Sequence, residues 1–311
     1  MYILSSIKYY YFVSIDNISF FSGLAYRVHR FSLKIDPRIE MARCYYKIFG
    51  KLPDFKNPKS LIEKIYWLQL NTDTSQWSYC ADKYLVRSFL KEKGCEQYLN
   101  KLYGRWDSPD EIDFCKLPNQ FVLKTNNACD QTLIVEDKER IDEVELKKSL
   151  KWWMNHPFGA SGGELHYLNI KPCVIAEKLL PKQEGESSLI DYKFWFFSGE
   201  PFCVFVTYGR TDEGFNFALY DLNWQPLSQF VRSTSHATFF PEKKIAKPDS
   251  FDEMLTLARK LAEGFPAVRV DLYEVDNRPI FGEMTFSTGF GYFTDDFYRI
   301  LGDKVVLPIV N

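Results

Sequence analysis

The feature that most constrains the fold is a change of pattern near residue 118. Six short β-rich runs follow it, separated by turn residues, as expected of β-strands. They read "QFVLK", "TLIVED", "PCVIAEKLL", "YKFWFFSG", "PFCVFVTYG" and "FNFALYD". Helical patterns interrupt this part of the chain around 141–154 and in "FDEMLTLARKLAEG". Strands with segregated helices predict an α+β architecture.

The residues before about 115 have a mainly helical pattern. "NPKSLIEKIYWLQL" begins with Asn57 and Pro58, which suit a helix start, and repeats apolar residues at helical spacing. "DKYLVRSFLKEKG" does the same and stops at Gly94. At 311 residues the chain is long for one hydrophobic core, so we expect more than one lobe.

Charge and cysteine content narrow the function classes. The formal net charge of −2 gives no indication of a nucleic-acid partner. Seven cysteines without a CxxC pair fit thiols in a reducing cytosol and disfavour a zinc site. The stretch 1–21 is aromatic, but Lys8 and Asp16 interrupt it and it offers no window of eighteen apolar residues. We expect a cytoplasmic protein, with peripheral association at the inner membrane face as the alternative.

Two acidic residues stand in strand-like text near the C-terminus, in "RVDLYEVDNRPIFGEMTF". A hairpin with residues 276–278 as its loop would pair Val275 with Pro279 and place Asp271 opposite Glu283. Directly opposed residues share a face, and like charges there destabilise a sheet. The sequence therefore poses the question of what balances these two carboxylates.

A divalent cation would balance them. Alternation groups Asp271 with Arg269, and it groups Glu283 with Phe281 and Thr285. Oxygen donors without His or Cys suit magnesium, which commonly takes one or two carboxylates and completes its shell with water and phosphates. Arg269 could reach a phosphate or a developing negative charge. The alternative is a solvated acidic face, or a register that separates the acids.

Two further stretches could meet a nucleotide. Lys124 ends the strand "FVLK", and the loop 126–131 before the next strand could close over phosphates, although it lacks glycine. Residues 177–179 could present backbone groups to an adenine. Asp191 and Lys193 share a strand face and could contact ribose and phosphate, or one another. The alternative for Lys124 is a solvated lysine, and the alternative for residues 177–179 is an ordinary strand.

Taken in order, these pieces resemble the ATP-grasp superfamily, and within it the TupA-like group linked to bacterial cell-surface polysaccharide synthesis. The motifs "FVLK", "VIAEKLL" and "RVDLY…IFGEMTF" follow one another at the expected spacing. "IFGKLPDFKNPKSLIEKIYWLQL", "DKYLVRSFLKEKG", "LYGRWD", "DYKFWFFSGEP" and "LARKLAEGFPAVRVDLYEV" also look like that group. The resemblance covers roughly residues 45 to 305 and implies two α+β subdomains gripping ATP, preceded by a mainly helical region.

The resemblance implies three regions: a helical N-terminal or substrate region (1–115), a small ATP-grasp subdomain (116–180), and a C-terminal subdomain with the metal site (181–311). It also implies roles for single residues. ATP would be bound by Lys83, Lys124, Glu177, Lys178, Leu179 and Asp191; Mg²⁺ by Asp271, Glu283 and Thr285; and Arg269, Lys193 and Arg210 would act in catalysis.

Two departures from the family pattern stand out. The loop that is normally rich in glycine reads "NNACDQ" here, and Thr285 stands where related ligases often have Asn.

The implied activity is ATP-dependent ligation of a carboxylate to an amine through an acyl phosphate. The partners would be ATP, a saccharide containing a uronic acid, and a small amine such as an amino acid or amino alcohol. Two alternatives stay open: a phosphotransferase acting on a sugar, and an ATP-binding protein with little catalysis. The sequence does not define the oligomeric state.

Overall fold

The computed structural model describes residues 26–27, 29–129, 131–156, 158–183, 185–211, 213–288 and 291–309. The aromatic stretch 1–21 and Asp130 of the expected phosphate loop lie outside them. The chain divides into two compact units built from separated segments. The first contains Met1–Cys44, Ser75–Ser88 and Asn100–Leu179, and the second contains Tyr45–Thr74, Phe89–Leu99 and Leu180–Asn311.

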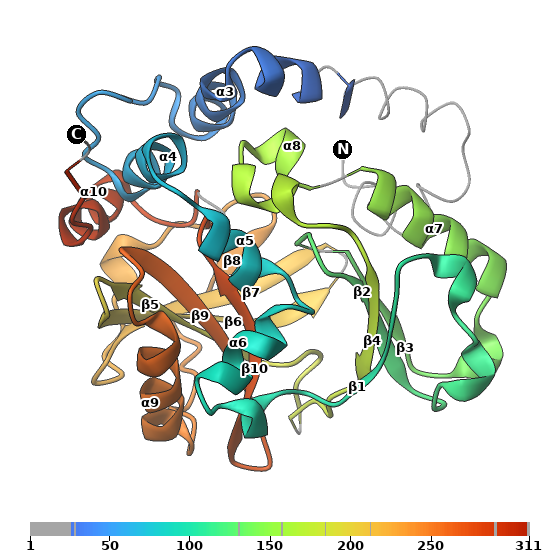
Figure 1. The fold of residues 1–311 in the computed structure, drawn as a ribbon. Helices are drawn as coiled ribbons and strands as arrows, with labels where there is room; N and C mark the ends of the chain where they lie inside the picture. The colour runs from blue at the N-terminus through green and yellow to red at the C-terminus, as the bar shows by residue number, and fades with distance from the viewer. Residues whose placement is uncertain are drawn as a thin grey trace. The chain divides into compact units, whose positions relative to one another are not determined.

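Each unit has its own sheet in the described part of the chain (Figure 1). The first unit holds a four-stranded antiparallel sheet in the order β1-β4-β2-β3. Its strands are β1 (Leu102–Trp106), β2 (Phe121–Thr125), β3 (Thr132–Val135) and β4 (Val174–Lys178). The other elements that lie wholly in this unit are α5 (Ser75–Ala81), η2 (Pro109–Glu111), η3 (Phe114–Lys116), η4 (Lys138–Arg140), α7 (Glu143–Asn155), α8 (Gly159–Gly162) and η5 (Leu165–Asn169).

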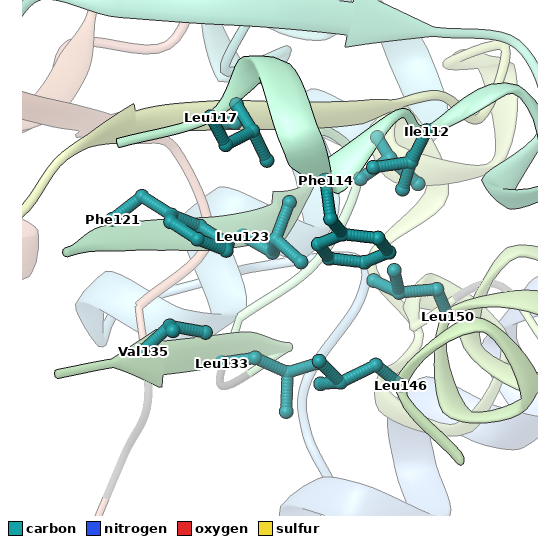
Figure 2. Close-up of a cluster of buried hydrophobic side chains, with 11 residues drawn as sticks. Ile112, Phe114, Leu117, Phe121, Leu123, Leu133, Val135, Leu146 and Leu150 are labelled. Carbon is teal, nitrogen blue, oxygen red and sulfur yellow. The ribbon is translucent and has the colours of Figure 1, made fainter. Parts of the chain in front are cut away.

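Helix α7 covers one face of the first unit's sheet. It starts at Asp142, whose carboxylate caps the first turn by accepting hydrogen bonds from the amides of Val144 and Glu145. The buried cluster beneath it is drawn in Figure 2 and comprises Ile112, Phe114, Leu117, Phe121, Leu123, Leu133, Val135, Leu146, Leu150, Val174 and Ala176. Because side chains alternate along a strand, Lys124 and Glu177 lie on the opposite face of this sheet.

The second unit holds a six-stranded sheet in the order β10-β9-β5-β6-β7-β8, in which the β7–β8 pair is parallel and the other pairs are antiparallel. Its strands are β5 (Asp191–Phe197), β6 (Glu200–Thr211), β7 (Gly214–Asp221), β8 (Ala237–Phe239), β9 (Ala267–Val275) and β10 (Arg278–Thr285). Its helices are α4 (Leu61–Asn71), η1 (Glu96–Tyr98), η6 (Ser228–Phe230), α9 (Phe251–Ala262) and α10 (Asp295–Lys304), while α3 (Pro37–Phe49) and α6 (Val86–Glu92) run from one unit into the next.

Helix α9 buries its apolar side against one face of this sheet. Phe251, Met254, Leu257 and Leu261 are buried, and the ring of Phe251 lies 5.6 Å from that of Phe194 on β5. The residues of β5 and β9 that alternate with those beneath α9 therefore point to the other face. That face carries most of the charged residues singled out in the sequence.

The expected α+β architecture is confirmed, and each expected β-rich run forms a strand. Strands β1 and β8 were not expected. Helix α4 begins later than expected, since its N-cap is Ser60 in a capping box with Glu63. The residues before 115 are shared between the two units, and the proposed boundaries at 115 and 180 stay predictions.

The β9–β10 hairpin differs from its expected form. Its loop has two residues, Asp276 and Asn277, both with positive φ, as in a type I′ turn, so Val275 pairs with Arg278 rather than with Pro279. A β-bulge at Gly282 then shifts the register by one residue. A Cβ on this glycine would lie 2.9 Å from the carbonyl oxygen of the facing strand, which is why no larger residue fits easily.

The bulge decides which residues share a face. With the two-residue turn alone, Gly282 would lie opposite Asp271. The bulge shifts the pairing by one residue, so Glu283 lies opposite Asp271 as expected. The expected grouping of Phe281 with Glu283 and Thr285 is wrong, because Phe281 pairs with Leu272 on the side covered by α9.

Two further observations bear on the expected environment. All seven cysteines lie among the described residues, and none of them forms a disulfide. No helix in the described ranges is long and apolar enough to cross a membrane.

Candidate functional site

A cluster of charged and polar side chains occupies one face of the second unit's sheet. We call it the carboxylate–cation cluster, and it consists of Asp191, Lys193, Arg269, Asp271, Glu283 and Thr285. The strand pairing creates it, because β9 lies between β5 and β10, and Asp271 on β9 lies opposite both Lys193 on β5 and Glu283 on β10. The structure thus brings these six predicted residues together.

Asp271 is the centre of the cluster and is only 1% exposed. Arg269 donates two hydrogen bonds to its carboxylate, from Nε to Oδ1 and from Nη2 to Oδ2, each 2.7 Å long. Lys193 Nζ donates to Oδ2 at 2.6 Å. Such bidentate, charge-assisted contacts are the strong form of an ion pair. The chain itself therefore supplies the counter-charge that the sequence left open for Asp271.

Arg269 also connects the two strands of the hairpin. Its Nη2 donates to the hydroxyl of Thr285 at 3.1 Å and lies 3.7 Å from Glu283 Oε1. The Thr285 hydroxyl donates in turn to Glu283 Oε1 at 3.4 Å, and Arg269 Nη1 donates to the Thr288 hydroxyl at 3.2 Å. The Glu283 side chain is 26% exposed, so this carboxylate, unlike that of Asp271, is accessible to a ligand from solvent.

Burial and mutual charge shift the pKa values of the cluster. Burial raises the pKa of Asp191 although Lys193 opposes the shift. Burial also disfavours the charged form of Lys193, but Asp191 and Asp271 outweigh it and raise the lysine pKa. The charge of Asp191, followed by burial, raises the pKa of Tyr273 well above its ordinary value. Asp191 and Lys193 contact one another directly, which was one of the two alternatives for this pair.

The cluster's chemistry fits a magnesium ion. Its three carboxylates outnumber its two cations, and the donors are oxygens. Among the described residues no three His, Cys, Asp or Glu side chains converge on one point. Magnesium usually needs only one or two protein carboxylates beside phosphate and water. The predicted ligands are Asp271, Glu283 and Thr285, of which Asp271 would first have to release a hydrogen bond from Arg269 or Lys193.

A smaller cluster lies in the first unit, on the sheet face away from α7. Glu177 Oε2 accepts a hydrogen bond from Lys124 Nζ at 3.0 Å, and its Oε1 accepts one from Arg87 Nη1 at 3.2 Å. Arg87 also donates to the carbonyl of Asn100 at 2.8 Å. Two cations on one buried carboxylate leave an excess of positive charge, which suits an anion such as phosphate.

The backbone at the end of β4 is partly engaged. The Lys178 amide donates to the Lys101 carbonyl at 2.9 Å, and the Lys178 carbonyl accepts from the Asn100 side-chain amide at 2.8 Å. A carbonyl has two lone pairs and can accept a second hydrogen bond. The role of Glu177, Lys178 and Leu179 in framing an adenine stays a prediction.

The loop after β2 is held by its neighbours. Its ends are joined by the hydrogen bond from the Thr125 amide to the Gln131 carbonyl, 3.2 Å long. Lys83 Nζ donates to the Ala128 carbonyl at 2.6 Å, and the Lys83 amide donates to the Asn126 carbonyl. In this structure Lys83 contacts the loop backbone, and its contact with a nucleotide stays a prediction.

Asn127 is the exceptional residue of that loop. Its side chain is fully buried, and within the described residues neither its amide nitrogen nor its amide oxygen has a hydrogen-bond partner. An orphaned buried polar group costs about 1–3 kcal/mol. A residue that is unfavourable for stability at a suspected phosphate loop is typical of a functional position.

Replacing Asn127 by Leu is expected to leave the free energy of unfolding unchanged or to raise it by about 1 kcal/mol, because the change removes the unsatisfied amide. The same variant is expected to bind ATP at least about tenfold more weakly if the amide meets a phosphate when the loop rearranges. Urea denaturation and calorimetric titration with ATP measure the two effects. A destabilised variant with unchanged ATP affinity would assign Asn127 a purely structural role.

Sequence reasoning missed Arg87 and Asn127 as site residues. Arg87 stands in "DKYLVR", but Glu177 lies 90 residues away and no local spacing connects the two. Asn127 was noted only as part of a loop without glycine. Arg210 lies exposed at the end of β6, with its guanidinium 5.1 Å from the Phe215 ring centroid.

The α+β fold thus holds a lysine–glutamate pair in one unit and paired carboxylates in the other. The family model described as TupA-like ATPgrasp matches residues 63–306, and the chain belongs to this family. No curated protein matches the chain.

Solved structures resemble the chain more distantly. A D-alanine–D-alanine ligase from Bacillus anthracis, complexed with ATP, is 15% identical, with 76% of this chain and 66% of that one covered at a TM-score of 0.43. The corresponding ligase of Helicobacter pylori is 15% identical, with 79% and 66% covered at 0.42. An L-amino acid ligase from Bacillus licheniformis is 14% identical, with 81% and 55% covered at 0.43. The chain thus spans less than two thirds of these proteins' lengths.

Proposed function

We propose that the protein is an ATP-dependent carboxylate–amine ligase that forms an amide through an acyl phosphate. Its substrates would be a uronic acid of a surface polysaccharide, or of a precursor, and a small amine such as an amino acid or amino alcohol. Membership of the TupA-like ATP-grasp family supports the reaction class. The polysaccharide context rests on what that family resemblance implies.

The observation that carries the proposal is the row formed by Lys193, Asp271 and Glu283 across three adjacent strands, with Arg269 bonded to its centre. A row of this kind holds negative and positive charge at fixed positions on a rigid sheet. Preorganised charge of both signs is what phosphoryl transfer requires, because the protein contributes mainly positioning and electrostatic stabilisation.

The reaction proceeds in two displacements. An oxygen of the substrate carboxylate attacks the γ-phosphorus of ATP, and the bond between this phosphorus and the β-phosphate oxygen breaks. The products of this step are ADP and an acyl phosphate. The amine nitrogen then attacks the acyl carbon, phosphate departs and a proton is lost, so the products are an amide, ADP and phosphate. Magnesium, when bound, would neutralise charge on the transferring phosphates.

The chain's own residues have separate tasks in these steps. Lys124 binds phosphate oxygens from the first unit, and Arg210 attracts the anionic acceptor. Lys193 orients the Asp271 carboxylate through its 2.6 Å hydrogen bond. Arg269 stabilises the oxyanion of the second displacement. Burial lowers the pKa of its guanidinium, but the charges of the surrounding carboxylates, Asp271 above all, outweigh burial and raise that pKa. No nucleophilic side chain is needed.

The test is mass spectrometry of the products formed from ATP, Mg²⁺ and a panel of uronic sugars and amines. We expect ADP and phosphate to appear only when an acid and an amine are both present. The expected product has the mass of the acid plus that of the amine minus that of one water. ADP with one acceptor and a phosphorylated product would favour the phosphotransferase. ATP binding without ADP formation across the panel would contradict both enzymatic functions.

A further inference from the structure

The segment 29–49 carries an unusual exposed face. Residues 29–35 are helical, and after Asp36 the chain continues into α3. Phe31 is 65% exposed, Ile35 63% and Ile39 46%. Phe31 and Ile35, four residues apart, lie on the same side of the helix at 29–35, and Ile39 follows in α3 after the interruption at Asp36. We call these three exposed side chains the apolar stripe. Stripes of large apolar side chains are expected against a core rather than in water.

Cations flank the apolar stripe. An exposed cation directly precedes each of the three apolar residues in the sequence. These cations are Arg30, Lys34 and Arg38. Arg27, which precedes this segment in the chain, is also exposed. The stripe and its cations together form what we call the basic apolar face: Arg27, Arg30, Phe31, Lys34, Ile35, Arg38 and Ile39.

The two carboxylates of this segment compensate only one cation of the basic apolar face, Arg38. Asp36 is half-buried and forms an ion pair with Arg38, in which Nη2 lies 2.7 Å from Oδ2. Glu40 is buried and accepts hydrogen bonds from His29, Ser32 and Arg43. The local charge is therefore positive in a chain whose net charge is −2.

The opposite side of the segment is held in place. The Glu40 contacts tie the helix at 29–35 to the first turns of α3, and Met41 is fully buried. The orientation of the basic apolar face is thus fixed by the packing of the other side. Its exposure is a property of the folded chain and not of a detached helix.

We propose that the basic apolar face binds the surface of an anionic lipid bilayer. Phe31, Ile35 and Ile39 would enter the boundary between headgroups and acyl chains, and the flanking cations would meet lipid phosphates. A helix face that combines large apolar side chains with Lys and Arg is the form that lies in this interface. A polyanion such as nucleic acid would use the cations but leave the apolar stripe in water, so the observations favour the membrane.

This proposal does not depend on the ligase activity, because lipid binding needs no turnover. Its test is co-sedimentation of the full chain with vesicles of phosphatidylcholine alone and with vesicles containing phosphatidylglycerol. We expect binding to the anionic vesicles that weakens as NaCl is raised, since salt screens the charges. Loss of activity in a variant would not bear on it.

Two paired variants separate the contributions of the face. Arg30→Gln with Lys34→Gln is expected to weaken vesicle binding by about 25-fold, taking roughly fivefold for each cation near an anionic surface. Phe31→Gln with Ile35→Gln is expected to weaken it at least about tenfold through lost apolar burial. The controls are Lys91→Gln with Lys244→Gln for charge and Val144→Gln for an exposed apolar side chain, all distant in sequence from the face.

Several outcomes would overturn the proposal. Equal sedimentation with neutral and anionic vesicles, or equal losses in the control variants, would show that the face is not the binding surface. Binding that the cation pair abolishes but the apolar pair leaves unchanged would indicate a polyanion site instead. Dimerisation that only Phe31→Gln with Ile35→Gln prevents, without vesicle binding, would assign the face to a second copy of the chain.

Discussion

Replacing Asp271 by Asn is expected to lower the free energy of unfolding by about 3–5 kcal/mol, because breaking a buried ion pair leaves uncompensated charge in the interior. Arg269 and Lys193 both donate to this carboxylate, and it is 1% exposed. The amide of Asn keeps one acceptor but cannot balance either cation. Urea denaturation followed by circular dichroism measures the loss.

The matched control for Asp271→Asn is Asp276→Asn, in the exposed turn of the same hairpin, which we expect to change stability by less than about 0.5 kcal/mol. The double variant Asp271→Asn with Lys193→Met should lose less than the sum of the single variants, by about 1–3 kcal/mol, because it removes a cation together with its partner. Additive losses would contradict the proposed coupling of these two residues.

Replacing Glu283 by Gln is expected to change stability little and to lower activity strongly. Its carboxylate is partly exposed and lies 3.7 Å from Arg269, so we expect stability to change by no more than about 1 kcal/mol. If this carboxylate holds magnesium on the ATP phosphates, kcat for ADP release should fall by about 100-fold or more, with a higher magnesium concentration needed for half-maximal rate. A coupled ADP assay over a range of Mg²⁺ concentrations measures both.

Glu200→Gln, at the exposed start of β6, is the control for Glu283→Gln and should retain full activity. An unchanged kcat and an unchanged magnesium dependence in Glu283→Gln would contradict the metal assignment. Asp271→Asn removes both a proposed magnesium ligand and a buried ion pair, so Glu283→Gln is the variant that tests the ligand separately from stability.

The strands of the second half were predictable because their determinants are local. Runs such as "YKFWFFSG" alternate along the strand and end at turn residues, and both properties act over a few positions. The opposition of Asp271 and Glu283 was also expected, but for an incomplete reason. The counting assumed a three-residue loop, whereas the structure combines a two-residue turn with a bulge at Gly282, and the two shifts cancel.

Contacts between distant segments were not predictable. Glu177 meets Arg87 through the pairing of β1 and β4 and the placement of α6, and nothing in "VIAEK" or "DKYLVR" encodes that contact locally. The burial of Asn127 likewise depends on what surrounds the loop. A sequence pattern reports which side of its own element a residue occupies, but not which element covers that side.

The sequence by itself determined the chemistry of the site: two carboxylates on adjacent strands, and an arginine two residues before the first of them. Only the tertiary structure decided what balances Asp271. Lys193 lies 78 residues earlier in the chain, and it reaches this carboxylate because β5 pairs with β9 in a register that places the two residues opposite each other. The order of strands in a sheet results from packing of the whole unit, so local pattern cannot encode it.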